Sequence, residues 1–334
     1  MGKITVSAPG KLMLLGEHAV VYHHPCLVIT VDQRIQTTVE VIDRNEFQLE
    51  ARDVGISGYK KPISKLGKGH IPKGAKFVEI AVANSIGHPE LVSGFRNKFG
   101  MTKEMGIRIK TESEFPSQYG FGSSSAVTVC VIKALSELFN LKLSKKEIFN
   151  LAYKTVLDIQ GKGSGFDIAA AVYGGTLYFL TGGKTIEFLN VPSIPLIVGY
   201  SGVKSDTAVL VNKVKKSFSN KKNRLDEIYN SIEVLVNKAK AALIKKDWEM
   251  LGDLMNQNQN YLKELGVSTP KLDNMIKAAL NGGAYGAKLS GAGGGDCMVA
   301  VVSDEKRGKV IGAIQSAGGE IIDIKTGAEG VRIE

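Results

Sequence analysis

A glycine- and serine-rich segment, PSQYGFGSSSA at residues 116–126, has the composition of a phosphate-binding loop. It follows a predicted strand and opens a predicted helix. Gly120 and Gly122 would let phosphate oxygens approach the backbone N–H groups, and the start of the helix adds further N–H donors and the positive end of its dipole. The adjoining hydroxyls, which could contact phosphate or Mg²⁺, belong to Ser123 and Ser124. A plain strand-to-helix turn is the structural alternative.

This segment departs from two common nucleotide-binding fingerprints. The chain contains no G-x-x-x-x-G-K sequence, so it has no Walker A loop. Ser125 stands at the third glycine position of the dinucleotide fingerprint. The stretch about 20 residues further on, LKLSKKE, is predicted as a helix start rather than a strand that ends in an acid. A dinucleotide-dependent enzyme is therefore the disfavoured alternative.

Residues 8–22, with the sequence APGKLMLLGEHAVVY, place three polar side chains in an otherwise apolar stretch: Lys11, Glu17 and His18. Lys11 follows a Pro-Gly pair, which predicts a turn at the end of a strand. A hairpin with a surface lysine is the structural alternative for this segment.

Two more glycine-rich segments carry candidate chemistry. In GKGSGFDIAAAVYGG, Asp167 stands where a loop meets a helix, so a helix N-cap is the structural alternative. In KLSGAGGGDCMVAVV, residues 288–302, the glycines that begin at Gly291 lie between two predicted strands. A hairpin needs fewer glycines, so we expect something large to pack on this backbone.

The elements that must position these residues form a mixed α/β chain. Periodicity predicts strands at residues 3–8, 27–42, 106–112, 176–180, 196–201, 285–290, 297–302 and 320–326. It predicts helices at residues 125–139, 144–159, 167–173, 206–217, 224–245, 247–264, 270–282 and 304–317. Residues 50–76 are expected to form a loop-rich insertion. The proline-flanked stretch 192–195 is expected to separate two domains, residues 1–190 and 191–334.

The composition describes an ordinary globular chain with excess positive charge. Its 334 residues are 43% hydrophobic and carry a net charge of +10, which suits anionic ligands. The lysines are scattered along predicted helices, which disfavours nucleic acid. No apolar run reaches the roughly 18 residues of a membrane span, and three distant cysteines predict buried thiols in a reducing compartment. We expect a cytoplasmic protein without nucleic-acid or membrane partners, either a monomer or a homodimer.

Taken in order, these segments resemble the GHMP kinases. Residues 8–22 are similar to the family's N-terminal motif, residues 116–126 to its phosphate loop P-x-x-x-G-[LF]-G-S-S-x-A, and residues 288–296 to its C-terminal glycine loop. The resemblance implies an N-terminal α/β nucleotide domain, a C-terminal ferredoxin-like domain and an active site between them. It also implies phosphoryl transfer from ATP, with Mg²⁺, to a small molecule.

The resemblance assigns a role to each candidate residue. Asp167 would accept the proton of the acceptor, and Lys11 would neutralise charge beside it. The residues expected to bind the acceptor are Glu17, His18, Thr207 and Gly291, with Glu17 also bracing Lys11 or His18. The residues expected to bind ATP are Gly120, Gly122, Ser123, Ser124 and Ser125, with Ser124 also on the metal.

Two acceptors are considered within the family. The stretch EHAVVY and Thr207 look like mevalonate kinase, whereas QYGFGSSSAVTVCVIKAL and GAGGGDC look like bacterial phosphomevalonate kinase. Mevalonate kinases carry a Mg²⁺-binding Glu where this chain has Val156, so Asp158 or Asp167 is expected to stand in. We favour phosphorylation of mevalonate to 5-phosphomevalonate in isoprenoid biosynthesis. Phosphomevalonate kinase activity and a non-catalytic metabolite-binding homologue are the alternatives.

Overall fold

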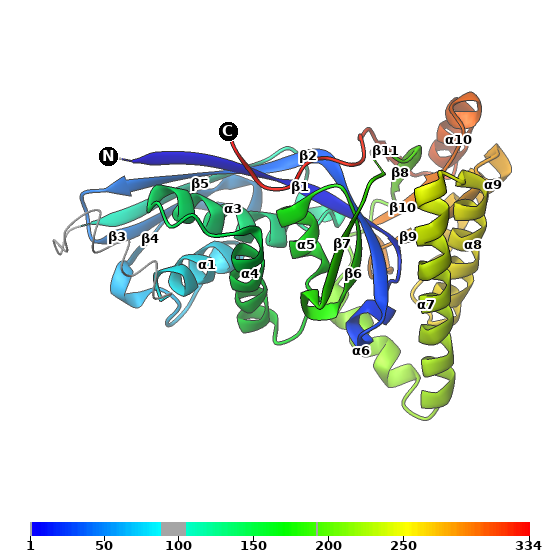
Figure 1. The fold of residues 1–334 in the computed structure, drawn as a ribbon, viewed down its shortest axis with the longest axis horizontal. Helices are drawn as coiled ribbons and strands as arrows, with labels where there is room; N and C mark the ends of the chain where they lie inside the picture. Colours follow the sequence, from blue (N-terminus) through cyan, green and yellow to red (C-terminus); the bar gives the residue numbers. More distant parts are fainter. Residues whose placement is uncertain (1, 88–104, 192) are drawn as a thin grey trace.

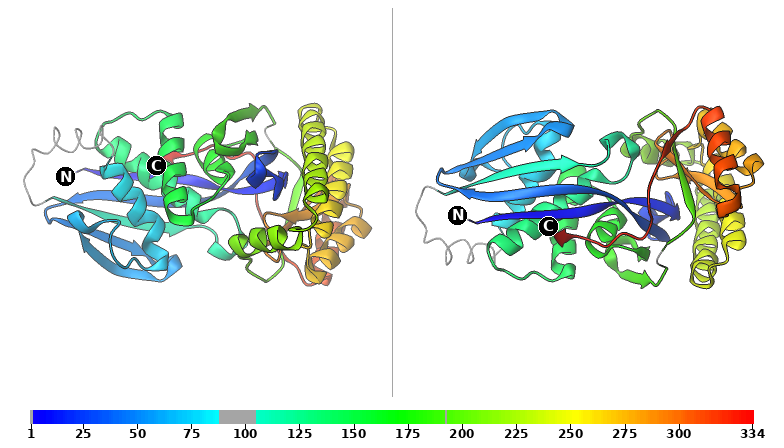
Figure 2. Two further views of the ribbon diagram at one scale, coloured as in Figure 1. Left: turned by 90° about the horizontal axis from the view of Figure 1, so that it is seen from below. Right: turned by 90° about the horizontal axis from the view of Figure 1, so that it is seen from above.

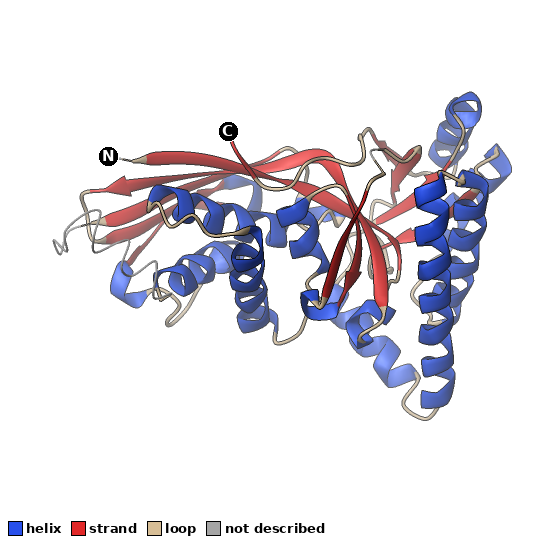
Figure 3. Ribbon diagram, in the orientation of Figure 1, coloured by secondary structure: helices blue, strands red, loops and turns tan. Residues whose placement is uncertain are grey.

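The computed structural model describes residues 2–87, 105–191 and 193–334, and builds them around two β-sheets (Figures 1 and 3). The larger sheet has the order β12-β1-β2-β5-β3-β4, with β6 pairing β2 and β7 pairing β6. Its strands are β1 (Lys3–Leu15), β2 (Pro25–Ile42), β3 (Glu46–Ala51), β4 (Ile56–Pro62), β5 (Gly106–Ser113), β6 (Thr176–Leu180), β7 (Thr185–Leu189) and β12 (Arg332–Ile333). Apart from the parallel pair β3–β5, neighbouring strands are antiparallel.

Helices cover one face of this sheet (Figure 3). They are α1 (Lys76–Ile86), α3 (Ser123–Leu138), α4 (Lys145–Gln160) and α5 (Phe166–Tyr173). Helices α3 and α5 pack directly on β1 and β2, and α1 and α4 pack against α3. The predicted capping box of α4 is present, since Ser144 and Glu147 cap each other's backbone N–H groups. Strand β1, which carries the candidate residue Lys11, therefore lies directly beside the helix that follows the phosphate loop.

The second half of the chain forms the predicted ferredoxin-like unit. Its elements are β8 (Leu196–Tyr200), α6 (Thr207–Ser217), α7 (Lys222–Lys245), α8 (Trp248–Glu264), α9 (Pro270–Gly282), β9 (Gly286–Ser290), β10 (Cys297–Val301), α10 (Asp304–Ser316) and β11 (Glu320–Ile322). The antiparallel order β11-β8-β10-β9, with helices between β8 and β9 and between β10 and β11, is the β-α-β-β-α-β arrangement. The two-domain α/β fold expected from the sequence is confirmed.

The end of the chain returns to the first sheet. Strand β12 pairs with β1, and the C-terminal segment runs beside that sheet in the right-hand view of Figure 2. The buried guanidinium of Arg34 donates hydrogen bonds to the carbonyl oxygens of Ser7, Glu329 and Gly330. The predicted domain boundary between residues 190 and 191 stays a prediction. The last residues of the predicted second domain pack on the sheet of the first.

Three local expectations need correction. Strand β1 does not end at a Pro-Gly turn: it shifts register between Pro9 and Gly10 and continues to Leu15, which places Lys11 inside the sheet. The expected loop-rich insertion contains β4, which pairs with β3 as a hairpin. Strand β11 stops at Ile322 rather than residue 326.

The structure bears on two predictions about the chain's surroundings. The three cysteines are buried free thiols, as expected. Within the described ranges, no helix has the length and apolar character to cross a membrane.

Candidate active site

A cavity of about 360 Å³ lies between the two halves of the chain and is lined by every catalytic, acceptor-binding and ATP-binding residue that the sequence suggested. Its lining comes from β1, the phosphate loop, the start of α5, the segment before α6 and the glycine loop between β9 and β10. The halves meet beside it, where the Ser290 hydroxyl of β9 bonds the backbone N–H and carbonyl of Met13. Motifs far apart in sequence thus converge on one space.

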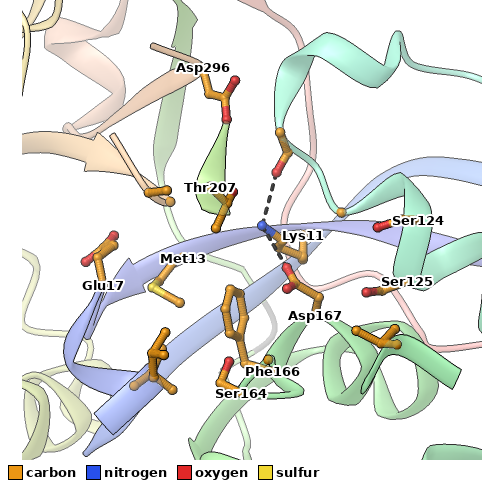
Figure 4. Close-up of a pocket in the computed structure, with 18 of the residues that line it drawn as sticks. Lys11, Met13, Glu17, Ser124, Ser125, Ser164, Phe166, Asp167, Thr207 and Asp296 are labelled. Carbon is orange, nitrogen blue, oxygen red and sulfur yellow. Dashed lines mark hydrogen bonds and ion pairs between the residues drawn. The ribbon is translucent and has the colours of Figure 1, made fainter. Parts of the chain in front are cut away.

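An ion pair between Lys11 and Asp167 lies at the centre of the cavity (Figure 4). The distance from Lys11 Nζ to Asp167 Oδ1 is 2.9 Å, and the two side chains are 9% and 31% exposed. The ammonium also donates to the Gly120 carbonyl at 3.0 Å and lies 5.1 Å from the ring centre of Phe166. A lysine held on three sides is fixed in one position beside the carboxylate.

Neither structural alternative describes this pair. Lys11 is buried in β1, so it is not a surface lysine. Asp167 is the second residue of α5, whose N-cap is Gly165, and the Asp167 side chain makes no capping hydrogen bond. Asp167 therefore does not cap α5, which is the structural role that its position in the sequence suggested.

The phosphate loop ends in two glycines with left-handed backbone. Gly120 has a φ of +74° and Gly122, the N-cap of α3, has a φ of +78°. A Cβ on Gly122 would lie 3.0 Å from Lys11 Cε and 3.4 Å from Asp167 Oδ1. The bare glycine thus brings the first turn of α3 against the ion pair. Within that turn the Ser125 N–H donates to the Gly122 carbonyl at 3.0 Å, so the N–H groups of Ser123 and Ser124 are the ones that face a ligand. Figure 4 shows Ser124 and Ser125 of that turn facing the same space.

His18 lies on the other side of the cavity in an unusual backbone conformation with a φ of +60°. Its Nε2 is 2.9 Å from the carbonyl oxygen of Ala292, and its buried Nδ1 has no hydrogen-bond partner within the described residues. Burial lowers the pKa of the imidazole. A neutral ring that donates from Nε2 leaves Nδ1 as an acceptor for a hydroxyl.

Glu17 does not brace Lys11 or His18, as the sequence suggested. Its carboxylate forms a fully buried ion pair with Lys288 of β9 and accepts a hydrogen bond of 3.2 Å from Asn258 Nδ2. Burial lowers the pKa of the Lys288 ammonium, and the charge of Glu17 opposes that change. Because β1 and β9 belong to different halves of the chain, the pair ties the two halves together below the cavity.

Thr207 and Gly291 also lie where the sequence suggested. Thr207 is the first residue of α6, and Asp206 caps that helix by accepting a hydrogen bond of 3.1 Å from Val209 N. A Cβ on Gly291 would meet nothing within 4 Å, so this part of the glycine loop borders open space.

The metal prediction is wrong for Asp158 and stays a prediction for Asp167. Asp158 lies on the exposed face of α4, where it pairs with Lys154 at 2.6 Å and accepts from Asn84 at 2.9 Å, and it does not line the cavity. Val156 does line it. The described residues contain no group of three or more His, Cys, Asp or Glu placed to hold a metal. A hydroxyl at Ser124 and a carboxylate at Asp167 fit an ion held mainly by phosphates and water.

Sequence reasoning missed several lining residues. Phe166 and Ser164 flank the expected base, and their adjacency in sequence was the available signal. Asp296, which ends the glycine loop, and Lys204, three residues before Thr207, also line the cavity. Asp296 ends the glycine motif 288–296 but was given no role, and Lys204 carried no motif signal.

A second cavity of about 360 Å³ adjoins the other side of the phosphate loop. Its walls include the apolar side chains of Val54, Phe77, Val78 and Val127. Within the described residues, those that line both cavities are Ser117, Ser123, Ser124 and Lys204. The first turn of α3 therefore separates an apolar chamber from one that holds the Lys11–Asp167 pair.

Known proteins share this sequence and fold. Residues 90–175 match the model of the GHMP kinases N terminal domain, and residues 239–320 match that of the GHMP kinases C terminal domain. The chain is 35% identical to a mevalonate kinase of Thermococcus sibiricus and 36% identical to one of Pyrococcus abyssi, in both cases over 99% of this chain and 98% of the relative. The crystal structure of the Methanococcus jannaschii mevalonate kinase matches with a TM-score of 0.80 at 27% identity, over 97% of this chain and 98% of that chain.

The chain belongs to the GHMP kinases. It is an ATP-dependent small-molecule kinase, as the phosphate loop, the ion pair and the two-domain fold together require. Each relative described above is, more narrowly, a mevalonate kinase.

Proposed function

We propose that this kinase transfers the γ-phosphoryl group of ATP to the 5-hydroxyl of mevalonate and so makes 5-phosphomevalonate for isoprenoid biosynthesis. One observation carries the proposal: the residues suggested by three separated motifs line a single cavity around the Lys11–Asp167 pair. Its relatives over 99% of the chain are mevalonate kinases, which supports this acceptor.

The nucleotide lies across the first turn of α3 in this proposal. The apolar second cavity takes the base and ribose, and the triphosphate follows the N–H groups of Ser123 and Ser124 and the Ser125 hydroxyl into the first cavity. Helix N-termini bind phosphate in this way because their N–H groups are unpaired and the dipole favours negative charge. The γ-phosphoryl group then arrives beside Lys11.

Proton transfer and charge stabilisation fall to the ion pair. The acceptor hydroxyl loses its proton to Asp167 as its oxygen forms a bond to the γ-phosphorus and the bond to ADP breaks. Lys11, 2.9 Å from that carboxylate, stabilises the alkoxide character of the oxygen and the charge on the phosphoryl group. Both groups are already in place, so little reorganisation is needed at the moment of transfer.

The charges of the cavity favour mevalonate over phosphomevalonate. Within the described residues, the lysines that line it are Lys11 and Lys204. The triphosphate, including the group being transferred, already engages these two cations, which leaves no lysine for the additional phosphate group of phosphomevalonate. His18 Nδ1 would accept a hydrogen bond from a hydroxyl of the acceptor.

We assign Mg²⁺ to the phosphates, with Ser124 and Asp167 as the protein groups within the same cavity. The ion would neutralise charge on the β- and γ-phosphates. A cytoplasmic location is supported by three buried thiols without a disulfide. Assembly as a homodimer stays a prediction.

Product identification tests the proposal. The protein is incubated with ATP, Mg²⁺ and mevalonate, and phosphorus NMR follows the products. We expect ADP and one new phosphomonoester in equal amounts. ATP that stays intact, or that is hydrolysed to ADP and inorganic phosphate alone, would refute the proposed function.

A further inference from the structure

Lys204 occupies a position that none of the motifs explains. It lies in the segment between β8 and α6, and it is the one charged residue among those shared by the two cavities in the described part of the chain. Its Nζ is 3.4 Å from the Ser117 hydroxyl of the phosphate loop. The side chain is exposed, so it reaches this junction as a cation in solvent.

Asp296 holds the segment that carries Lys204. The backbone N–H of Asp296 donates to the Val203 carbonyl at 2.7 Å, and the Asp296 carbonyl accepts from Ser201 N at 2.9 Å. The carboxylate accepts from Ser205 N at 2.8 Å and from the Ser205 hydroxyl at 2.7 Å. Asp296 therefore makes four hydrogen bonds to residues on both sides of Lys204, which fix the backbone that carries this lysine.

The same carboxylate lies against the phosphate loop. A Cβ on Gly120 would lie 2.7 Å from Asp296 Oδ2, so this glycine lets the two segments approach closely. Asp296 itself has a φ of +54°, a conformation that only a well-determined surrounding maintains. The segment bearing Lys204 is thus fixed relative to Gly120, whose carbonyl also holds Lys11.

We propose that Lys204 is a further catalytic residue, which binds the β- and γ-phosphate oxygens of ATP from the second half of the chain, and that Asp296 is its positioning residue. This assignment rests on the proposed function, because it places the triphosphate where the two cavities meet. Lys11 and Lys204 then lie on different sides of the transferred group, one from each half of the chain.

The step is balanced with the groups already named. A bond forms from the acceptor oxygen to the γ-phosphorus, the bond from that phosphorus to the β–γ bridging oxygen breaks, and the hydroxyl proton passes to Asp167. Negative charge grows on the departing bridging oxygen. Lys204 neutralises it, as cations aimed at developing charge do in phosphoryl transfer.

Nucleotide binding tests the assignment without any acceptor. Dissociation constants of ATP and AMP are measured by calorimetry for the wild type and for Lys204→Met. We expect the variant to bind ATP about tenfold more weakly, the value of one charge-assisted hydrogen bond, and AMP within about twofold of wild type. The matched control is Lys162→Met, an exposed lysine that lines neither cavity and bonds Asn212 instead.

Turnover gives the second readout. Lys204→Met should lower kcat with mevalonate by about 10²–10³-fold, as loss of a stabilising donor does, while Lys204→Arg recovers most of the rate. If Asp296 acts through Lys204, the double variant Asp296→Asn/Lys204→Met should be no slower than Lys204→Met alone. A double variant slowed by the product of the two single effects would refute the positioning role.

The outcomes separate the two proposals. A Lys204→Met variant whose ratio of ATP to AMP affinity equals that of wild type would overturn the assignment and leave the proposed function standing. A wild type that binds ATP normally but does not phosphorylate mevalonate would refute the acceptor, whereas the loss of ATP affinity in the variant would still support Lys204. A wild type that does not bind ATP would overturn both.

Discussion

At the scale of single residues, the proposed function divides two tasks of phosphoryl transfer between Asp167 as the base and Lys11 as the cation. The pair is buried enough to be held in one geometry, yet Asp167 keeps 31% of its side chain exposed toward the cavity. Lys11 Nζ also donates a hydrogen bond to the Gly120 carbonyl, which fixes the position of the ion pair relative to the phosphate loop. Chemistry and phosphate binding therefore depend on the same lysine.

Replacement of Asp167 separates catalysis from stability. Asp167→Asn removes the base but leaves α5 intact, because Asp167 does not cap that helix. We expect a melting temperature close to wild type and a kcat lower by about 10²–10⁴-fold. Lys11→Met should be similarly slow, and the double variant scarcely slower than either single one. A kcat for Asp167→Asn within about threefold of wild type, far from the range for a base, would rule this carboxylate out.

Gly122 offers a test of the approach between loop and ion pair. In Gly122→Ala, the added Cβ would lie 3.0 Å from Lys11 Cε, so the ammonium must move. We expect a loss of kcat of about tenfold or more, measured at saturating substrates. Gly161→Ala is the matched control: its φ is +72°, but a Cβ there meets nothing within 4 Å. Both changes should cost about 1–2 kcal/mol of backbone strain. Equal kcat values for the two variants would mean that the contact with Lys11 is irrelevant.

His18 predicts a dependence of stability on pH. Burial lowers the pKa of this imidazole in the folded state below its value of about 6.5 in the unfolded chain. Below about pH 6.5 the unfolded state binds more protons, so the free energy of unfolding decreases as the pH falls, by up to ~1.4 kcal/mol per unit. Urea denaturation between about pH 7.5 and about pH 5 should show a steeper decrease for wild type than for His18→Gln. Parallel curves would contradict the buried neutral ring.

At the scale of elements, the segment after β1 is joined to the middle of β9 by the buried pair Glu17–Lys288. Removal of one partner leaves a buried charge without compensation, which costs about 3–5 kcal/mol. We therefore expect Lys288→Met to lower the free energy of unfolding by about that amount in urea denaturation. The double variant Glu17→Leu/Lys288→Met should recover most of the loss, because it removes both charges. A loss below about 1 kcal/mol in Lys288→Met would show that the pair is dispensable.

The sequence predicted the elements well where a single signal decided them. The capping box set the start of α4, and Thr269 followed by Pro270 set the start of α9. The extent of β1 could not be predicted, because Pro9 and Gly10 read as a turn. In the sheet they form a register shift, since Lys11 onward continues to pair with β2.

The candidate site was predictable where its residues lie within contiguous motifs. Lys11, Gly122 and Asp167 were suggested because each lies in a glycine-containing segment that resembles a GHMP kinase motif. The partner of Glu17 was not, because Lys288 lies 271 positions away and nothing local marks the pair. Lys204 was missed for a similar reason: its importance comes from its position between two cavities.

At the scale of the whole molecule, the active site exists only because two folding units meet. The first sheet and its helices supply the ion pair and the phosphate loop, and the ferredoxin-like unit supplies Lys204, Thr207 and the glycine loop. The C-terminal segment returns from the ferredoxin-like unit to the first sheet, where β12 pairs with β1 and Arg34 donates hydrogen bonds to its backbone carbonyls. Substrate choice is therefore a property of both units together.

The ratio of kcat/KM for mevalonate to that for 5-phosphomevalonate tests the central claim most directly. ADP formation is measured with both acceptors under the same conditions, with ATP and Mg²⁺ saturating. Because both lysines that line the cavity within the described residues are engaged by the triphosphate in this account, the additional phosphate group of 5-phosphomevalonate has no lysine to bind. We predict that mevalonate is preferred by about 100-fold or more, which corresponds to ~2.7 kcal/mol of differential binding in the transition state. Equal values, or a preference for 5-phosphomevalonate, would contradict the account.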